Sequence, residues 1–225
     1  MTMEKFETME NIRSVKKVFW ENPYQTEINA KVTSIKGNEI TVDQTIFYAF
    51  SGGQESDEGT IGGKKVLGAK KEGKNIVYTL DDTDGLKVGQ EVEIRINEER
   101  RLKLMRLHFA TEIVLVLIYR NLPSIEKIGA HIAEDKARID FRHDGNLAEI
   151  LSEILGAANK MIGKDELIVS DFSDMENELR YWEISEFAKV PCGGTHPKRT
   201  GEIGSISLKR KTAGKGKERV EIYLA

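Results

Sequence analysis

One uninterrupted segment, from Glu98 to Arg120, most constrains how this chain can fold. It contains no glycine and no proline, and most of its residues have high helix propensity. Asn97 is a suitable N-cap, and Asn121-Leu122-Pro123 ends the segment because proline cannot continue a helix. The sequence therefore predicts one long helix near the middle of the chain, with a different kind of structure on each side of it.

The chain before this helix has the pattern of short strands. Residues 28–32 and 40–42 alternate apolar with polar side chains, and the turn Lys36-Gly37-Asn38 lies between them. The same pattern continues to Ile96, interrupted by frequent glycines. Short strands separated by glycine turns predict a small closed β-barrel, which we assign to an N-terminal domain of residues 1–95.

The chain after Asn97 combines the long helix with strands and a second helix. Residues 137–141 alternate as a strand does, and Asn146 followed by Glu149 predicts a capping box that opens a helix to about Met161. Further strand-like segments occur at residues 167–169, 181–184, 204–208 and 220–224. We expect an α+β domain over residues 96–225, with helices packed on a mostly antiparallel sheet.

Composition and charge exclude several classes of protein. No apolar run reaches the roughly 18 residues that a membrane span requires, so no membrane partner is expected. The N-terminal sequence lacks the pattern of a secretory signal, and the single cysteine cannot form an internal disulfide; both favour a cytoplasmic protein. The net charge of -3 argues against non-specific coating of nucleic acid. An RNA partner would have to meet a local basic patch.

A glycine-containing basic segment near the C-terminus is the best candidate for such a patch. Its positive residues are Lys209, Arg210, Lys211, Lys215, Lys217 and Arg219. A basic loop of this kind can follow phosphates, although a solvated hairpin tip is the simpler alternative. A second, weaker basic strip lies on the long helix at Arg100, Arg101, Lys103 and Arg106.

The only cysteine of the chain lies four residues before a histidine, in Pro191-Cys192-Gly193-Gly194-Thr195-His196. Thiolate and imidazole are preferred ligands of zinc, and glycines let the backbone bend tightly enough to direct both side chains to one point. Two ligands do not make a metal site, so further donors have to come from elsewhere in the chain.

His108 and Glu112 are the best candidates for those donors. They are four residues apart on the predicted helix and therefore share one face, between the apolar Leu104 and Leu115. Polar groups on a buried stripe need partners. The two side chains either hydrogen-bond each other in the core or join Cys192 as metal ligands, and the spacing alone does not choose between these possibilities.

Four motifs, in the same order, resemble those of the alanyl-tRNA editing family. His108-Phe109-Ala110-Thr111-Glu112 stands where the family carries H-x-x-x-H, and Cys192-Gly193-Gly194-Thr195-His196 matches its C-x-x-x-H. Residues 52–59 are similar to its glycine-rich signature, and Lys136–Phe141 matches a strand of the family. The resemblance covers nearly the whole chain and is greatest to the free-standing AlaX editing proteins of the medium type.

This resemblance implies an ATP-independent hydrolase that acts in trans for translation fidelity. Its expected partner is tRNA(Ala) mischarged with serine, and also with glycine, and its expected cofactor is Zn(2+). The implied metal ligands are His108, Glu112, Cys192 and His196. Glu112 departs from the family because it replaces the second helical histidine; it is expected either to bind the metal or to act as a general base.

The resemblance also suggests which residues line the aminoacyl pocket, where the two domains meet. Gln54 is a candidate catalytic residue, and the candidate substrate-binding residues are Ser51, Gly52, Gly53, Gln54, Thr111 and Thr195. Without the resemblance, the glycine-rich residues would be interpreted as a barrel turn, and the threonines as supports for their neighbours.

Two other functions are compatible with the sequence. The replacement at Glu112 allows a tRNA-binding module of the same fold with weakened catalysis. Alternatively, Cys192 is a nucleophile activated by His108 or His196. The sequence does not predict the oligomeric state.

Overall fold

Two hydrophobic cores divide the chain near the start of the long helix. The computed structural model describes residues 14–225, so residues 1–13 of the predicted N-terminal domain lie outside the described part. One core draws its buried side chains from Val15 to Ile96, and the other draws them from Leu104 to Ile222. The boundary between the two cores therefore lies where the strand pattern of the sequence gives way to the helical segment.

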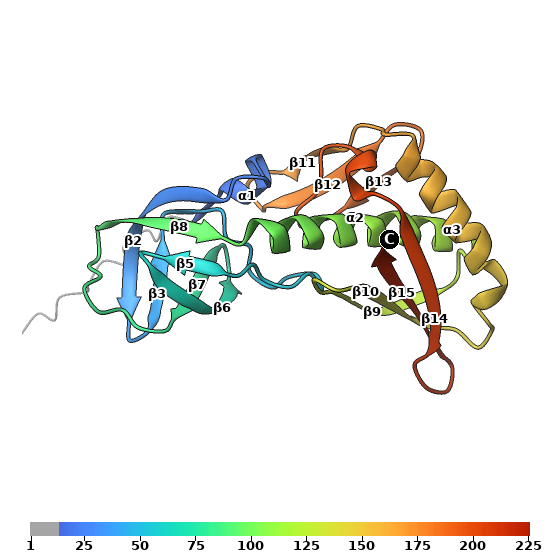
Figure 1. The fold of residues 1–225 in the computed structure, drawn as a ribbon, viewed down its shortest axis with the longest axis horizontal. Helices are drawn as coiled ribbons and strands as arrows, with labels where there is room; N and C mark the ends of the chain where they lie inside the picture. Colours follow the sequence, from blue (N-terminus) through green and yellow to red (C-terminus); the bar gives the residue numbers. More distant parts are fainter. Residues whose placement is uncertain (1–13) are drawn as a thin grey trace, which may run out of the picture.

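The first core is enclosed by six antiparallel strands. Neighbouring strands form a closed barrel in the order β2-β3-β7-β6-β5-β8 (Figure 1). Their bounds are β2 Glu27–Lys36, β3 Glu39–Val42, β5 Gly59–Ile61, β6 Lys64–Glu72, β7 Asn75–Leu80 and β8 Glu91–Ile96. In β8 every second side chain is buried, as the alternating sequence requires. The predicted turn between β2 and β3 contains Gly37 with a φ of 59°, a conformation that favours glycine.

A short N-terminal segment lies beside the barrel. Strand β1 (Lys16–Lys17) pairs in parallel with β4 (Gln44–Thr45), and the short helix α1 (Val18–Glu21) follows it. Phe19 of α1 belongs to the barrel core. Figure 1 shows α1 next to strand β11 (Val169–Asp174) of the second half of the chain.

Helix α2 (Glu98–Asn121) confirms the predicted long helix. The side chain of Asn97 accepts a hydrogen bond from the Arg100 backbone N–H, as expected of an N-cap. The helix extends from the barrel through the second half of the molecule (Figure 1), and most of its side chains from Leu104 onward are buried. Among residues 14–225, no helix is both long and apolar enough to cross a membrane.

The second half has two sheets in place of the single sheet that was expected. One has the order β14-β15-β10-β9 and the other β11-β12-β13, and helix α3 contacts α2 and β14. The bounds are β9 Glu126–Ile132, β10 Ala137–Arg142, α3 Ala148–Gly163, β11 Val169–Asp174, β12 Leu179–Ile184, β13 Ala188–Pro191, β14 Ile206–Thr212 and β15 Lys217–Leu224. All strand pairs in both sheets are antiparallel, which confirms the α+β class.

Strands β9 and β13 were not predicted. Most of their side chains are only half-buried, so their sequences lack the clear alternation of a strand with one buried face. They complete the two sheets through backbone hydrogen bonds, which leave no signature in the side-chain pattern.

The capping box predicted at Asn146 and Glu149 is not formed. Helix α3 begins at Ala148, after an N-cap at Leu147 that makes no side-chain capping bond. The side chain of Asn146 accepts a hydrogen bond from Ala148 N, two residues on. The fully buried Leu147 anchors this turn in the core, so packing sets the start of the helix.

Arg101 corrects the second basic strip that was expected on α2. Its guanidinium is fully buried, forms an ion pair with Asp57 and donates to the carbonyls of Pro23 and Ile46. A buried arginine is available to no phosphate. It connects the start of α2 to the barrel segments.

We expect Asp57→Ala to destabilise the protein strongly. Removing one partner of a buried ion pair leaves an uncompensated charge and costs about 3–5 kcal/mol. The exposed pair between Lys70 and Glu39 provides the control, because Glu39→Ala should lower the free energy of unfolding by about 0–1 kcal/mol. Urea denaturation of both variants measures the difference, and equal losses would contradict a connecting role for Arg101.

Candidate metal centre

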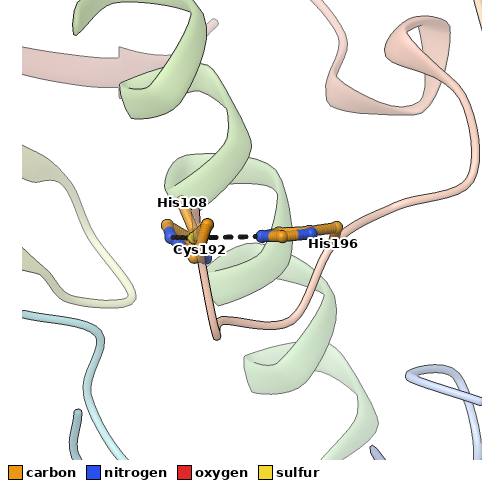
Figure 2. Close-up of side chains that lie close together, drawn as sticks. All are labelled: His108, Cys192 and His196. Atoms are coloured by element: carbon orange, nitrogen blue, oxygen red, sulfur yellow. Dashed lines mark hydrogen bonds between the residues drawn. The ribbon is translucent and has the colours of Figure 1, made fainter. Parts of the chain in front are cut away.

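His108, Cys192 and His196 converge on one point beside helix α2. Sγ of Cys192 lies 3.4 Å from Nε2 of His108 and 3.3 Å from Nε2 of His196. Figure 2 shows His108 projecting from the helix toward the loop that carries the other two side chains. The three donor atoms all lie within 4.8 Å of one another, and both histidines are buried.

Gly194 allows the loop to approach the helix this closely. A Cβ atom at this position would lie 1.8 Å from Cε1 of His108, a distance that no side chain can occupy. The neighbouring Gly193 has open space around its own Cβ position. The second glycine of the motif is therefore required by contact with His108, whereas the first is not.

The three donors fit a tetrahedral metal ion of the zinc type. Metal–sulfur bonds of about 2.3 Å and metal–nitrogen bonds of about 2.0–2.1 Å at a tetrahedral angle separate the donor atoms by roughly 3.5 Å. The two sulfur–nitrogen distances of 3.3 and 3.4 Å are close to that value. In addition, Nδ1 of His196 is 2.8 Å from the Ser170 hydroxyl, which directs Nε2 toward Cys192. The chain can thus supply three ligands from described residues.

Glu112 lies next to this group but outside the set of mutually close donors. Its Oε1 is 3.7 Å from Nε2 of His108, which is too long for a hydrogen bond, and its Oε2 accepts one of 2.9 Å from the indole of Trp182. The simple hydrogen-bonded pair considered for His108 and Glu112 is therefore not present. The expected metal-ligand role of Glu112 stays a prediction.

The protonation of the site follows from burial and from these neighbours. Burial alone lowers the pKa of His108, but the Cys192 sulfur and the Glu112 carboxylate outweigh it and raise the pKa to about 10. For His196 burial dominates, and the charges of His108 and Arg180 add to it, so its pKa lies well below the ordinary value. His196 is thus a neutral ligand, whereas a metal ion would have to displace a proton from His108.

Glu112 is held in its ionised form. Burial alone would raise the pKa of this carboxyl, but its interactions with His108 and the hydrogen bond from Trp182 outweigh burial and lower the pKa. A carboxylate with a lowered pKa is a weak base. It is better suited to accept a hydrogen bond than to remove a proton.

The glycine-rich segment forms a tight turn next to strand β9. Ser51 and Gln54 exchange backbone hydrogen bonds, with Gly52 and Gly53 at φ values of 61° and 91° between them. A Cβ at Gly53 would lie 2.6 Å from the Ala130 carbonyl oxygen, so glycine is required there. The segment is therefore a turn in the connection between β4 and β5 that is bonded to β9 of the second half, and its Gln54 side chain reaches the vicinity of Gly194.

Gln54 connects this turn to the loop from Cys192 to His196, which carries two of the three candidate donors and is called the metal-binding loop below. Its side chain is buried, donates a 2.9 Å hydrogen bond to the Thr195 hydroxyl and accepts one of 3.3 Å from the Thr195 backbone N–H. Ser51 and Gly52 are exposed, and the hydroxyl of Thr111 donates to the Leu107 carbonyl within its own helix. Of the predicted substrate-binding residues, Gln54 and Thr195 are the pair that the fold brings together.

Sequence reasoning missed four residues around the site. Ser170 orients His196, and Trp182 holds Glu112. Trp20 donates from its indole to the Gly193 carbonyl, and Arg180 lies close to Gly194. None of these follows a motif spacing. The chain has only two tryptophans, and their rarity was the one sequence signal, since both contact this region in the structure.

The predicted RNA-binding segment forms the hairpin of β14 and β15 (Figure 1). Three of its cations are already paired: Arg210 with Glu218, Lys211 with Glu221 and Arg219 with Asp140. Lys209 lies over the ring of Tyr223. Lys215 and Lys217, at the tip, have no ion-pair partner among the described residues.

Comparison with known proteins identifies the family. The chain is 35% identical over 217 residues to the alanyl-tRNA editing protein AlaX-M of Pyrococcus horikoshii, which covers 95% of this chain and 99% of that protein. The chain belongs to the AlaX-M family. The family resemblance found in the sequence is confirmed.

Other relatives are much longer than this AlaX-M family member. The alanine–tRNA ligase of Methanococcus aeolicus is 34% identical over 235 aligned positions, covering 95% of this chain but 26% of that protein. The ligase of Pyrococcus abyssi is 30% identical over 229 positions, covering 91% and 25% respectively. The family described as threonyl and alanyl tRNA synthetase second additional domain matches residues 179–221, and class II (A) tRNA synthetases match residues 1–100.

We expect Gln54→Ala to weaken the connection between the barrel turn and the metal-binding loop. The substitution leaves the hydroxyl and N–H of Thr195 buried without these partners, which costs about 1–3 kcal/mol. The control is Gln90→Ala, because Gln90 is exposed and accepts one hydrogen bond from Lys87; its effect should stay within about 0.5 kcal/mol. Urea denaturation gives both values, and an equally small loss in Gln54→Ala would contradict this role.

Proposed function

We propose that this chain is a cytoplasmic hydrolase that removes serine, and also glycine, from mischarged tRNA(Ala) in trans. The observation that carries the proposal is the convergence of His108, Cys192 and His196 in a chain that aligns with nearly all of an alanyl-tRNA editing protein. We assign residues 1–95 to an N-terminal barrel domain and residues 96–225 to the editing domain.

We assign zinc to the three donors because one thiolate and two imidazoles suit this ion. When bound, zinc would supply a Lewis acid for the ester carbonyl or lower the pKa of a water molecule. Three protein ligands leave a further coordination position for substrate or water. A direct bond from Glu112 would fill that position.

The protein's own residues would position the ester in this site. Gln54 holds the metal-binding loop through Thr195, so its catalytic contribution is to keep Cys192 and His196 in place. Glu112, ionised and oriented by Trp182, would accept a hydrogen bond from the attacking water or from the amino group of the aminoacyl ester. Ser51, Gly52 and Gly53 would form the edge of the aminoacyl pocket, and Thr111 would support His108 from within the helix.

The β14–β15 hairpin would contact the tRNA backbone. Lys215 and Lys217 at its tip are the cations most available to phosphates. The other predicted cations, Lys209, Arg210, Lys211 and Arg219, are engaged with Tyr223 or with carboxylates and would have to exchange those contacts for phosphate contacts.

We expect Cys192→Ala to abolish deacylation without unfolding the chain. Loss of a metal ligand should reduce the release of serine from Ser-tRNA(Ala) by at least about 100-fold. The assay follows labelled amino acid released from seryl-, glycyl- and alanyl-tRNA(Ala), and circular dichroism checks the fold. Unchanged turnover would contradict metal-centred hydrolysis. A wild-type protein that binds tRNA but releases no amino acid would instead indicate the non-catalytic module, whose activity Glu112→His should restore.

Alkylation separates the metal ligand from a nucleophilic cysteine. A bound metal should protect Cys192 from iodoacetamide, whereas fast alkylation in excess zinc would favour the nucleophile. Cys192 is half-buried and is the only cysteine, so each protein molecule has a single site to follow by mass spectrometry.

We expect Gly194→Ala, but not Gly193→Ala, to weaken metal binding. The added methyl group at Gly194 would overlap the His108 ring, whereas at Gly193 it meets no atom within 4 Å. Displacing one ligand should lower zinc affinity by at least about 10-fold. Competition with a chromophoric chelator measures the affinity of both variants, and equal affinities would contradict the dependence of the site on this contact.

A further inference from the structure

Arg180, on strand β12, is a buried cation without an ion-pair partner among residues 14–225. Arg180 is only 5% exposed, and its guanidinium lies 5.3 Å from the ring centres of both Trp20 and Phe172. Nη1 and Nη2 reach the carbonyls of Gly194 and Trp20 at 3.4 Å, and Nε has no hydrogen-bond partner among the described residues. The guanidinium therefore has donor capacity that the described residues leave unused.

The contrast with Arg101 shows that this arrangement is unusual within the same protein. Arg101 is also buried, but it forms an ion pair with Asp57 and donates to two backbone carbonyls at 2.6 and 2.8 Å. A buried charge without a counter-charge is costly unless a ligand supplies one. The surroundings of Arg180 are consequently suited to an anion.

A cavity of about 140 Å³ lies next to Arg180. Its wall includes Phe19, Trp20, Ser170, Arg180, His196 and Lys198. This volume is far larger than the roughly 10–15 Å³ that one water molecule requires. The one carboxylate of the wall belongs to Glu21, which is exposed and paired with Lys16 at 3.1 Å. The cavity therefore presents a net positive wall.

The cavity shares part of its wall with the candidate metal centre. His196 contributes to both, and Gly194, whose carbonyl accepts from Arg180, lies against His108. An anion in the cavity would thus lie one side chain away from the metal donors.

We propose that this cavity binds the phosphate of the 3′-terminal nucleotide of the tRNA substrate, with Arg180 as its main partner. This inference rests on the proposed function. In that nucleotide only the ribose and one methylene separate the 5′-phosphate from the oxygen that carries the amino acid. A phosphate held by Arg180 would therefore place the ester near His108, Cys192 and His196. Guanidinium groups suit this task because their planar donors match phosphate oxygens.

A purely structural role would make Arg180 a counter-charge for Cys192. In that case its replacement would change metal binding and would leave phosphate recognition unaffected. Replacement of Arg180 should therefore weaken metal binding if its role is structural, and phosphate binding if it holds the substrate.

The first test uses the wild-type protein with zinc bound. Isothermal titration calorimetry at low salt compares 5′-AMP with adenosine, which differ only in the phosphate. We expect 5′-AMP to bind at least about 10-fold more tightly, the factor of one charge-assisted hydrogen bond, and inorganic phosphate to compete with it. Equal affinities would overturn the proposal. Tighter binding of L-serine without any preference for 5′-AMP would assign the cavity to the product carboxylate and would also overturn it.

The second test uses Arg180→Gln, with Arg142→Gln as a control of equal charge change. The side chain of Arg142 is 66% exposed and paired with Glu126. Both residues lie in the β14-β15-β10-β9 sheet, whereas Arg180 lies in the other sheet. We expect Arg180→Gln to lose the preference for 5′-AMP while keeping its zinc content, and Arg142→Gln to keep both. Loss of zinc with an unchanged preference would overturn the proposal. If Arg180→Gln does not fold, Arg180→Lys, which keeps the charge, should retain part of the preference.

Deacylation kinetics keep this inference separate from the proposed function. Arg180→Gln should raise KM for Ser-tRNA(Ala) by about 10-fold or more through the lost phosphate contact. A wild-type protein that releases no serine but still prefers 5′-AMP would contradict the hydrolase and leave the phosphate site standing. A protein that hydrolyses the ester but does not prefer 5′-AMP to adenosine would support the hydrolase and contradict the phosphate site.

Discussion

The loop from Cys192 to His196 can supply metal donors because Gly194 lies directly against the ring of His108. Side chains of any size at this position would separate the loop from helix α2 and move the sulfur away from the imidazole. Other parts of the fold hold both sides of this contact in place. His108 is on a long buried helix, and the loop is held from outside by Gln54 and Trp20. A metal site gains affinity and geometry from such support around its ligands.

The barrel takes part in the site although it supplies none of the three donors. Its glycine-rich turn reaches Thr195 through Gln54, and the segment before β2 reaches Gly193 through Trp20. The buried pair of Arg101 and Asp57 connects the start of α2 to the same half of the molecule. Through these connections the N-terminal half of the molecule holds the loop from Cys192 to His196 in place.

The charges around the site are arranged in two different ways. Glu112 carries a negative charge that is satisfied by His108 and the indole of Trp182. Arg180 carries a positive charge beside a cavity, and its Nε has no hydrogen-bond partner among the described residues. A satisfied charge stabilises the site itself, whereas an unbalanced one is suited to a ligand.

Local features of the sequence predict the long helix and the strands of the barrel: helix propensity from Glu98 to Arg120, and alternation in strands such as β8. The candidate metal donors did not follow from spacing alone, because the resemblance to the editing family was needed to relate His108 to Cys192 and His196, and it included Glu112 as well. Which side chains contact one another was decided by the tertiary structure. It assigned Glu112 to Trp182, buried Arg101 with Asp57, divided the expected sheet in two and left Arg180 without an ion-pair partner among the described residues. Such pairings join residues far apart in the chain, and their energy depends on burial and distance, which no spacing in the sequence expresses.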